Sequence, residues 1–209
     1  VTGCALPFGG IGGSGDSKPD LSRYYNQNLT WTSCEDEFQC ASYQVPLDYS
    51  NPTGPALSIK ILKAPAKDPT RRLGSLVGNP GGPGASGVEF AQYAPGAITP
   101  GVMAQYDIVG FDPRGVGRSS SVDCGDLERS FRVVERDCIT RSGDLLPYVG
   151  TPNAARDMEQ LRKALGDEQL TYLGFSYGTA LGAVYADLFP ESVRALVLDG
   201  SVDPDAGSY

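Results

Sequence analysis

The stretch LTYLGFSYGTALGAVYADLFP, residues 170–190, decides the fold, because a short apolar run leads directly into a helical pattern. Within the helical part, Ala180, Val184 and Leu188 recur at every fourth position, which places them on one face of an α-helix. Pro190 ends the pattern, since proline cannot continue a helix. The stretch is therefore predicted to be a buried strand that turns sharply into an amphipathic helix.

Ser176 stands at the junction of this strand and helix, between Gly174 and Gly178 in the sequence GFSYG. Gly-x-Ser-x-Gly at such a junction is typical of a nucleophile elbow, a tight turn that exposes the serine Oγ and tolerates only small residues two positions away. The alternative is a tight turn in which the serine only packs. We interpret Ser176 as the nucleophile of an acyl-transfer reaction.

Acyl transfer also needs donors for the oxyanion, usually the backbone N–H after the nucleophile and one from a loop that follows an earlier strand. Tyr177 supplies the first. The sequence GSLVGNPGGPGASG, residues 74–87, runs from a predicted strand into a glycine loop, where the lack of side chains lets backbone approach substrate. We predict Gly82 as the second donor, with Gly81 next. A loop that only turns the chain is the alternative.

Two charged residues follow the predicted strand YDIVGF, in the sequence FDPRGVGRSS. Asp112 and Arg114 are predicted to pair and to brace the loop beside Ser176. This is a supporting role, favoured over direct participation in the chemistry.

Short apolar runs and helical segments alternate along the second part of the chain. Apolar runs of this kind, separated by helices, indicate parallel strands that are buried on both faces of a sheet. Two earlier runs, 41–47 and 56–64, are predicted to form an antiparallel pair, since residues 56–64 alternate apolar with polar. The predicted buried strands are 74–79, 106–111, 170–175 and 193–200.

The clearest separate helix is predicted over residues 151–167. Thr151 or Asn153 can cap its N-terminus, and Gly166 suits its C-terminal end. Residues 21–40 show no period and are expected to be irregular.

The composition excludes several classes of function. With 209 residues and 40% hydrophobic content, the chain is long enough for a buried core. A net charge of -8 argues against nucleic-acid binding, which relies on clustered Lys and Arg. The chain has no histidine and no cysteines at zinc-site spacing, so no metal site is expected. Residues 10–15 match a dinucleotide fingerprint but lack the flanking strand and helix, so no cofactor is expected.

Four of the five cysteines form two local pairs, Cys34 with Cys40 and Cys124 with Cys138. Disulfides between them would close short surface loops and imply an oxidising compartment. Free buried thiols are the alternative.

Cys4 ends the sequence VTGC, which resembles the lipobox at which bacterial lipoproteins are lipidated. Residues 1–30, which include FGGIGGSGDSKPD, are expected to be a flexible Gly/Ser-rich tether that holds the domain off a membrane. A disulfide to a partner and a spare thiol are the alternatives for Cys4. The expected location is secreted or anchored to a bacterial cell envelope.

Three motifs carry a resemblance to a known family: NPGGPGASG at 79–87, YDIVGFDPRGVGRSS at 106–120 and the long stretch at 170–204. In this order they resemble the secreted α/β-hydrolase peptidases of actinobacteria, the tripeptidyl aminopeptidase group, which is related to the proline iminopeptidases. The resemblance covers residues 31–205. It implies an α/β-hydrolase fold, a mostly parallel sheet flanked by helices, and a serine exopeptidase that removes short peptides from free N-termini.

The sequence has no histidine that could act as the general base. In α/β-hydrolases the acid and then the histidine follow the serine in chain order. Residues 31–209 are therefore expected to be the N-terminal portion of a catalytic domain, nearly inactive alone and completed by a C-terminal half that carries the last strands, the acid, the base and a lid. Asp199 and Asp203 are minor candidates for the acid. An esterase or lipase, and a non-catalytic envelope binding protein, are the alternative functions.

Overall fold

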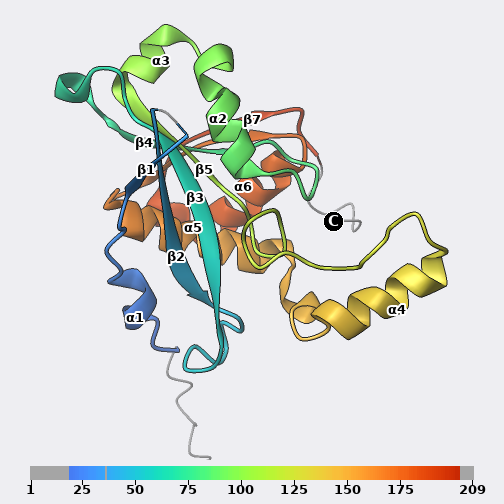
Figure 1. Cartoon of the computed structure of the whole chain (residues 1–209). Coiled ribbons are helices and arrows are strands. Elements are labelled where there is room, and N and C mark those ends of the chain that lie inside the picture. The colour runs from blue at the N-terminus through green and yellow to red at the C-terminus, as the bar shows by residue number, and fades with distance from the viewer. Residues whose placement is uncertain (1–18, 36, 203–209) are drawn as a thin grey trace, which may run out of the picture.

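The computed structural model describes residues 19–35 and 37–202 (Figure 1). Most of the tether expected over residues 1–30 lies outside this part of the chain. Cys4 and Asp203 lie outside it as well, so their expected roles stay predictions.

A single seven-stranded sheet, in the order β1-β2-β3-β5-β4-β6-β7, forms the centre of the molecule. The first three strands are antiparallel to their neighbours, and the last four pair in parallel. The antiparallel pair of β2 with β3 and the parallel strands were predicted, whereas β1 was not. Four predicted strands, from β3 to β6, have the predicted bounds. The strands are β1 (Thr32–Cys34), β2 (Phe38–Pro46), β3 (Ala56–Ala64), β4 (Gly74–Asn79), β5 (Tyr106–Phe111), β6 (Leu170–Phe175) and β7 (Val193–Asp199).

Helices cover both faces of the sheet (Figure 1). The helices α5 and α6 pack together against one face, and α2 packs against the other. The helices are α1 (Ser22–Tyr25), α2 (Gly87–Ala97), α3 (Pro100–Gln105), α4 (Phe131–Ser142), α5 (Thr151–Leu165) and α6 (Tyr177–Leu188), with short 3₁₀ helices at Pro69–Arg71, Leu146–Tyr148 and Pro190–Ser192.

The two faces of the sheet have separate cores, because neighbouring residues of a strand point to opposite sides. On β5, Val109 belongs to the core under α5 and α6, whereas Ile108 belongs to the core under α2 and α3. Met158 and Leu161 of α5 are fully buried in the first core. The strands that lead to Ser176 are therefore held from both sides.

The prediction that Thr151 or Asn153 caps the N-terminus of α5 is wrong. Gly150 is the N-cap, and Thr151 already belongs to the first turn. Both expected capping side chains bind elsewhere: the Thr151 hydroxyl bonds the Tyr177 hydroxyl, and the Asn153 amide donates to Tyr148 O. The C-terminal prediction is confirmed, since Gly166 ends the helix in the left-handed conformation with φ of 77°.

Residues 21–40 are not irregular throughout, because α1, β1 and the start of β2 lie there. Elements of three or four residues are too short to show a period in the sequence. Tyr24 of α1 is buried and donates from its hydroxyl to Pro52 O at 3.0 Å. Leu29 packs against the larger core. This part of the expected tether therefore lies on the domain.

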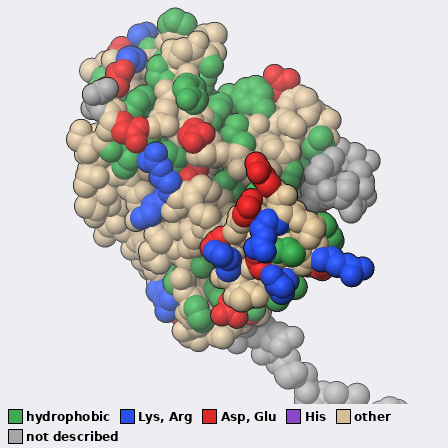
Figure 2. Space-filling model, turned by 45° about the vertical axis from the view of Figure 1, so that its right-hand side comes forward, with side chains coloured by type: hydrophobic (Ala, Val, Ile, Leu, Met, Phe, Trp, Pro, Cys, Tyr) green, Lys and Arg blue, Asp and Glu red, His purple; other side chains and the backbone are tan. Residues whose placement is uncertain are grey.

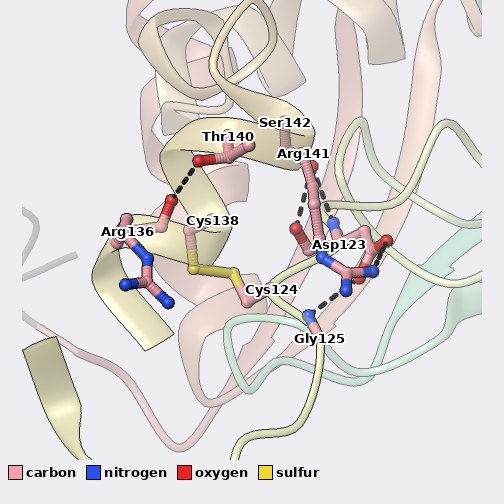
Figure 3. Close-up of a disulfide and its surroundings, with 8 residues drawn as sticks. All are labelled: Asp123, Cys124, Gly125, Arg136, Cys138, Thr140, Arg141 and Ser142. Atoms are coloured by element: carbon pink, nitrogen blue, oxygen red, sulfur yellow. Dashed lines mark hydrogen bonds and ion pairs between the residues drawn. A yellow bond between two sulfur atoms is a disulfide. The ribbon is translucent and has the colours of Figure 1, made fainter. Parts of the chain in front are cut away.

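Both predicted disulfides are confirmed. Cys34 and Cys40 join β1 to β2. Cys124 and Cys138 join a loop to α4, the helix that protrudes from the body of the fold (Figures 1 and 3).

The same loop is tied to α4 by polar contacts beside the disulfide (Figure 3). Asp123 donates from its N–H to Ser142 Oγ at 2.8 Å and forms an ion pair with Arg141 at 3.1 Å. Basic and acidic side chains lie together on the face that α4 and its neighbouring loops form (Figure 2). Among the described residues, no helix is both long and apolar enough to cross a membrane.

Candidate active site

Ser176 lies in a strained turn between β6 and α6, with φ of 51° and ψ of −122°. Non-glycine residues rarely adopt this conformation, and it persists only where the surroundings hold it. The Ser176 N–H donates to Asp199 O at 2.9 Å, and the Thr179 N–H donates to Ser176 O at 2.8 Å. The geometry is that of a nucleophile elbow, which presents the serine at the carboxyl end of a strand.

The two glycines that flank this turn are required by close packing. A Cβ on Gly174 would lie 2.4 Å from Gly178 O, and a Cβ on Gly178 would lie 2.7 Å from Asn79 O. Both distances are shorter than real Cβ contacts allow. The sequence GFSYG is therefore explained by the turn itself.

The glycine loop that follows β4 lies directly against the elbow. A Cβ placed on Gly81 would be 3.1 Å from Ser176 Cβ and 3.2 Å from Tyr177 N. Gly81 has a φ of 96°, and the next residue, Gly82, has a φ of 106°. The loop thus brings backbone close to Ser176, as predicted from its glycines.

The two candidate donors of this loop are not equivalent. The Gly81 N–H donates to Asn79 Oδ1 at 2.9 Å and is therefore occupied. The Gly82 N–H has no acceptor within the described part of the chain. The geometry favours Gly82 as the donor to an oxyanion, whereas Gly81 provides the close approach.

Asn79 is a site residue that the sequence analysis missed. Its side chain is buried, at 1% exposure, and its Oδ1 holds the glycine loop through Gly81. Its main-chain oxygen lies against Gly178 of α6. Asn79 therefore connects the loop after β4 to the elbow after β6. Its position in the sequence could have indicated this role, because Asn79 is a polar residue that ends a buried strand and precedes the glycine loop.

Asp112 supports the same loop, but not through the expected pair with Arg114. Its carboxylate accepts hydrogen bonds from Ser86 Oγ at 2.5 Å, from the Val88 N–H at 3.1 Å and from the Arg118 N–H at 2.8 Å. Ser86 and Val88 begin α2, the helix that follows the glycine loop. Asp112 therefore fixes the N-terminus of α2 to the loop after β5.

Arg114 pairs with Asp157 of α5 instead. Its Nε and Nη2 atoms donate to the two carboxylate oxygens at 2.7 and 2.6 Å. Its remaining three N–H groups donate to backbone oxygens of Leu47, Tyr148 and Pro46. The Asp112–Arg114 prediction is wrong because the two side chains reach different elements, α2 and α5.

The Arg114–Asp157 pair is fully buried, with 0% exposure of both side chains. Burial raises the pKa of the Asp157 carboxyl, and the hydrogen bonds and charge of Arg114 oppose that rise. The Tyr49 hydroxyl donates to Asp157 Oδ1 at 2.7 Å, and the Tyr43 hydroxyl donates to Asp157 O at 3.0 Å. This cluster joins β2, the loop after β5 and α5 far inside the protein.

Tyr177 and Asp199 are the remaining candidate residues in the described part of the chain. The Tyr177 backbone begins α6 beside Gly81, and its hydroxyl bonds Thr151 Oγ1 at 2.8 Å. Burial raises the pKa of the Tyr177 phenol, and the bond to Thr151 opposes that rise. Asp199 approaches Ser176 through its main-chain oxygen, whereas its side chain is exposed and forms no hydrogen bond or ion pair within the described residues.

No histidine occurs anywhere in the sequence, so this chain does not itself supply an imidazole base. Within the described residues, no group of three or more His, Cys, Asp or Glu side chains is arranged to hold a metal ion.

A family comparison fits this geometry. Residues 74–208, which contain the glycine loop and the elbow, match the α/β hydrolase fold family. The chain belongs to that family. Within this α/β-hydrolase, the predicted fold class is confirmed, with a sheet whose last four strands are parallel and with helices on both faces.

Curated relatives of this α/β-hydrolase include peptidases of actinobacteria. Tripeptidyl aminopeptidase of Streptomyces coelicolor is 37% identical over 215 residues, which cover 88% of this chain and 40% of that protein. Serine protease Hip1 of Mycobacterium tuberculosis is 36% identical over 239 residues, which cover 99% of this chain and 44% of that protein. The predicted resemblance to the tripeptidyl aminopeptidase group is confirmed.

A relative with a different name has similar identity. Carboxylesterase B of Mycobacterium tuberculosis is 38% identical over 209 residues, which cover 84% of this chain and 40% of that protein. The chain thus spans less than half the length of each of these three relatives.

Proposed function

We propose that the protein containing this chain is a serine exopeptidase that releases short peptides from free N-termini. The observation that carries the proposal is the strained Ser176 turn with the glycine loop packed against it. The relatives named as a tripeptidyl aminopeptidase and a serine protease support peptide substrates.

In the proposed mechanism, Ser176 Oγ attacks the carbonyl carbon of the scissile bond. A base takes the serine proton and later gives it to the leaving amine, and water then hydrolyses the acyl-enzyme. The N–H groups of Gly82 and Tyr177 donate to the oxyanion that forms on the carbonyl oxygen. Asn79 and Asp112 act by positioning the glycine loop.

The acid and the histidine base are proposed to come from the part of the protein outside this chain, a complementary C-terminal portion. Two observations support this: the sequence has no histidine, and the chain spans only 40–44% of the peptidase relatives. Asp199 and Asp203 remain lesser candidates for the acid. Without a triad member, only about 10³- to 10⁴-fold acceleration over water is expected from this chain alone.

An esterase is the second candidate, because carboxylesterase B shares 38% identity with this chain. Peptidase and esterase use the same nucleophile and oxyanion donors. The complete protein should hydrolyse a tripeptide p-nitroanilide with a free N-terminus and should lose that activity when the N-terminus is acetylated. Turnover of p-nitrophenyl butyrate with no peptide cleavage would assign the esterase instead, and turnover of neither substrate would favour a non-catalytic envelope protein.

Asn79 provides a test of the loop positioning. Asn79→Ala is expected to lower kcat/KM of the complete protein on the tripeptide anilide by about tenfold to a hundredfold, because Gly81 loses its acceptor. Asn79→Asp keeps an acceptor at the same place and should recover most of the activity. Equal activity of the wild type and Asn79→Ala would show that this hydrogen bond does not position the loop.

We also propose an extracytoplasmic location, supported by the two disulfides, with lipidated Cys4 as a membrane tether. Metabolic labelling with an alkynyl fatty acid tests the tether. The label should be present in the wild type and absent from Cys4→Ala, and equal labelling of the two would overturn it.

A further inference from the structure

We propose that the hollow between the glycine loop and α2 is a substrate subsite for a basic side chain, with Glu89 as its counter-charge. This inference rests on the proposed peptidase function and names a class of substrate for it. The cavity has a volume of about 530 Å³, within the usual range for ligand sites. It is lined by Pro80, Gly84, Ala85, Ser86, Glu89, Phe90, Tyr93 and Gly117.

The cavity adjoins the elbow through the glycine loop. Pro80 and Gly84 line it, and they bracket Gly81, whose backbone lies against Ser176. A peptide whose carbonyl carbon lies at Ser176 Oγ therefore has neighbouring residues within reach of this hollow.

Glu89 is the charged member of the cavity lining. Its side chain is exposed and has neither a hydrogen-bond nor an ion-pair partner within the described residues. The N–H of Glu89 donates to the Oγ of Ser86, the N-cap of α2, at 3.1 Å, whereas the Glu89 carboxylate takes no part in the cap. A carboxylate in this position favours a cationic group of a bound substrate.

The other charges near the cavity, an acidic and a basic side chain, are already paired. Asp112, beneath Ser86 and Gly117, is fully buried and already accepts three hydrogen bonds. Arg118 is ion-paired with Glu35 at 3.4 Å.

Two aromatic side chains line the cavity beside Glu89. Tyr93 is four residues further along α2, on the same side of the helix, and is 75% exposed. The Phe90 ring lies 6.0 Å from the ring of Phe175, the residue before Ser176, which ties this wall to the elbow. Aromatic faces of this kind suit the aliphatic stem of Lys or Arg and the cation at its end.

The test uses the complete protein and a set of tripeptide and tetrapeptide substrates that carry one variable residue at each position in turn. The variable residues are Lys, its neutral analogue norleucine, and Glu. The wild type should cleave the Lys substrate with kcat/KM about tenfold above the norleucine substrate at one position. Glu89→Gln should remove that preference, so that the kcat/KM of the Lys substrate falls to that of the norleucine substrate. Glu89→Lys should favour the Glu substrate at the same position.

Glu135→Gln, which changes an exposed carboxylate of α4, is the matched control and should keep the wild-type preference. The subsite is overturned if the wild type has no preference for Lys at any position, or if Glu89→Gln retains it. If the proposed peptidase function is wrong, the result differs: the wild type would cleave none of the substrates, including those with norleucine. The proposed subsite would then be overturned as well.

Discussion

Replacing Ser176 by alanine is expected to lower kcat of the complete protein by at least about 10⁴-fold while leaving its Tm nearly unchanged. A loss of this size is expected because the proposed acyl-enzyme forms on Ser176 Oγ. Alanine keeps the Cβ and the backbone bonds that hold the turn, so the fold is retained. Initial rates at saturating tripeptide anilide, together with thermal unfolding, measure both effects.

Ser33→Ala is the matched control, since Ser33 is exposed on β1, at the opposite end of the sheet from β7. It should retain the wild-type kcat. A Ser176→Ala protein with more than a tenth of the wild-type kcat would show that another residue is the nucleophile.

The second large effect concerns stability. Arg114→Met is expected to lower the free energy of unfolding by about 3–5 kcal/mol, because it leaves the Asp157 carboxylate buried without its partner. The Tm of the complete protein should fall as well. Three backbone oxygens also lose their donors. Thermal and denaturant unfolding of the complete protein measure the change.

Two further variants separate the buried charge from lost packing. Arg114→Met combined with Asp157→Leu removes both charges and should recover part of the lost stability, because an apolar pair can replace a buried ion pair. Arg132→Met, at an exposed position of α4, should change the Tm little. If Arg114→Met lowered the free energy of unfolding by less than about 1 kcal/mol, the Arg114–Asp157 pair would not stabilise the fold as proposed.

Local patterns predicted the elements on which the site is built. The strands β4, β5 and β6 end where Pro80, Asp112 and Ser176 follow, so their bounds could be read from the sequence. The Ser176 turn could be predicted as well, because Gly174 is required by a contact with Gly178 inside one strand–turn–helix unit. Gly178 is required by Asn79 of β4, which lies outside that unit.

Most contacts that support the site could not be predicted, because they join residues far apart in the sequence. The bond from Gly81 to Asn79, two residues away, is a local exception. Arg114 and Asp157 are partners only because the fold brings α5 beside the loop after β5. Asn79 and Glu89 gain their positions from the packing of the glycine loop against the elbow and against α2. The sequence neighbours Asp112 and Arg114 therefore suggested a pair that the fold separates.

The central claim is that Ser176 is an activated nucleophile in the complete protein. The most direct measurement is treatment of the complete protein with a fluorophosphonate probe, followed by digestion and mass spectrometry of the labelled peptide. The account predicts one adduct, on Ser176, which is lost in Ser176→Ala. An adduct on a different residue, or no adduct on Ser176 in the folded complete protein, would contradict it.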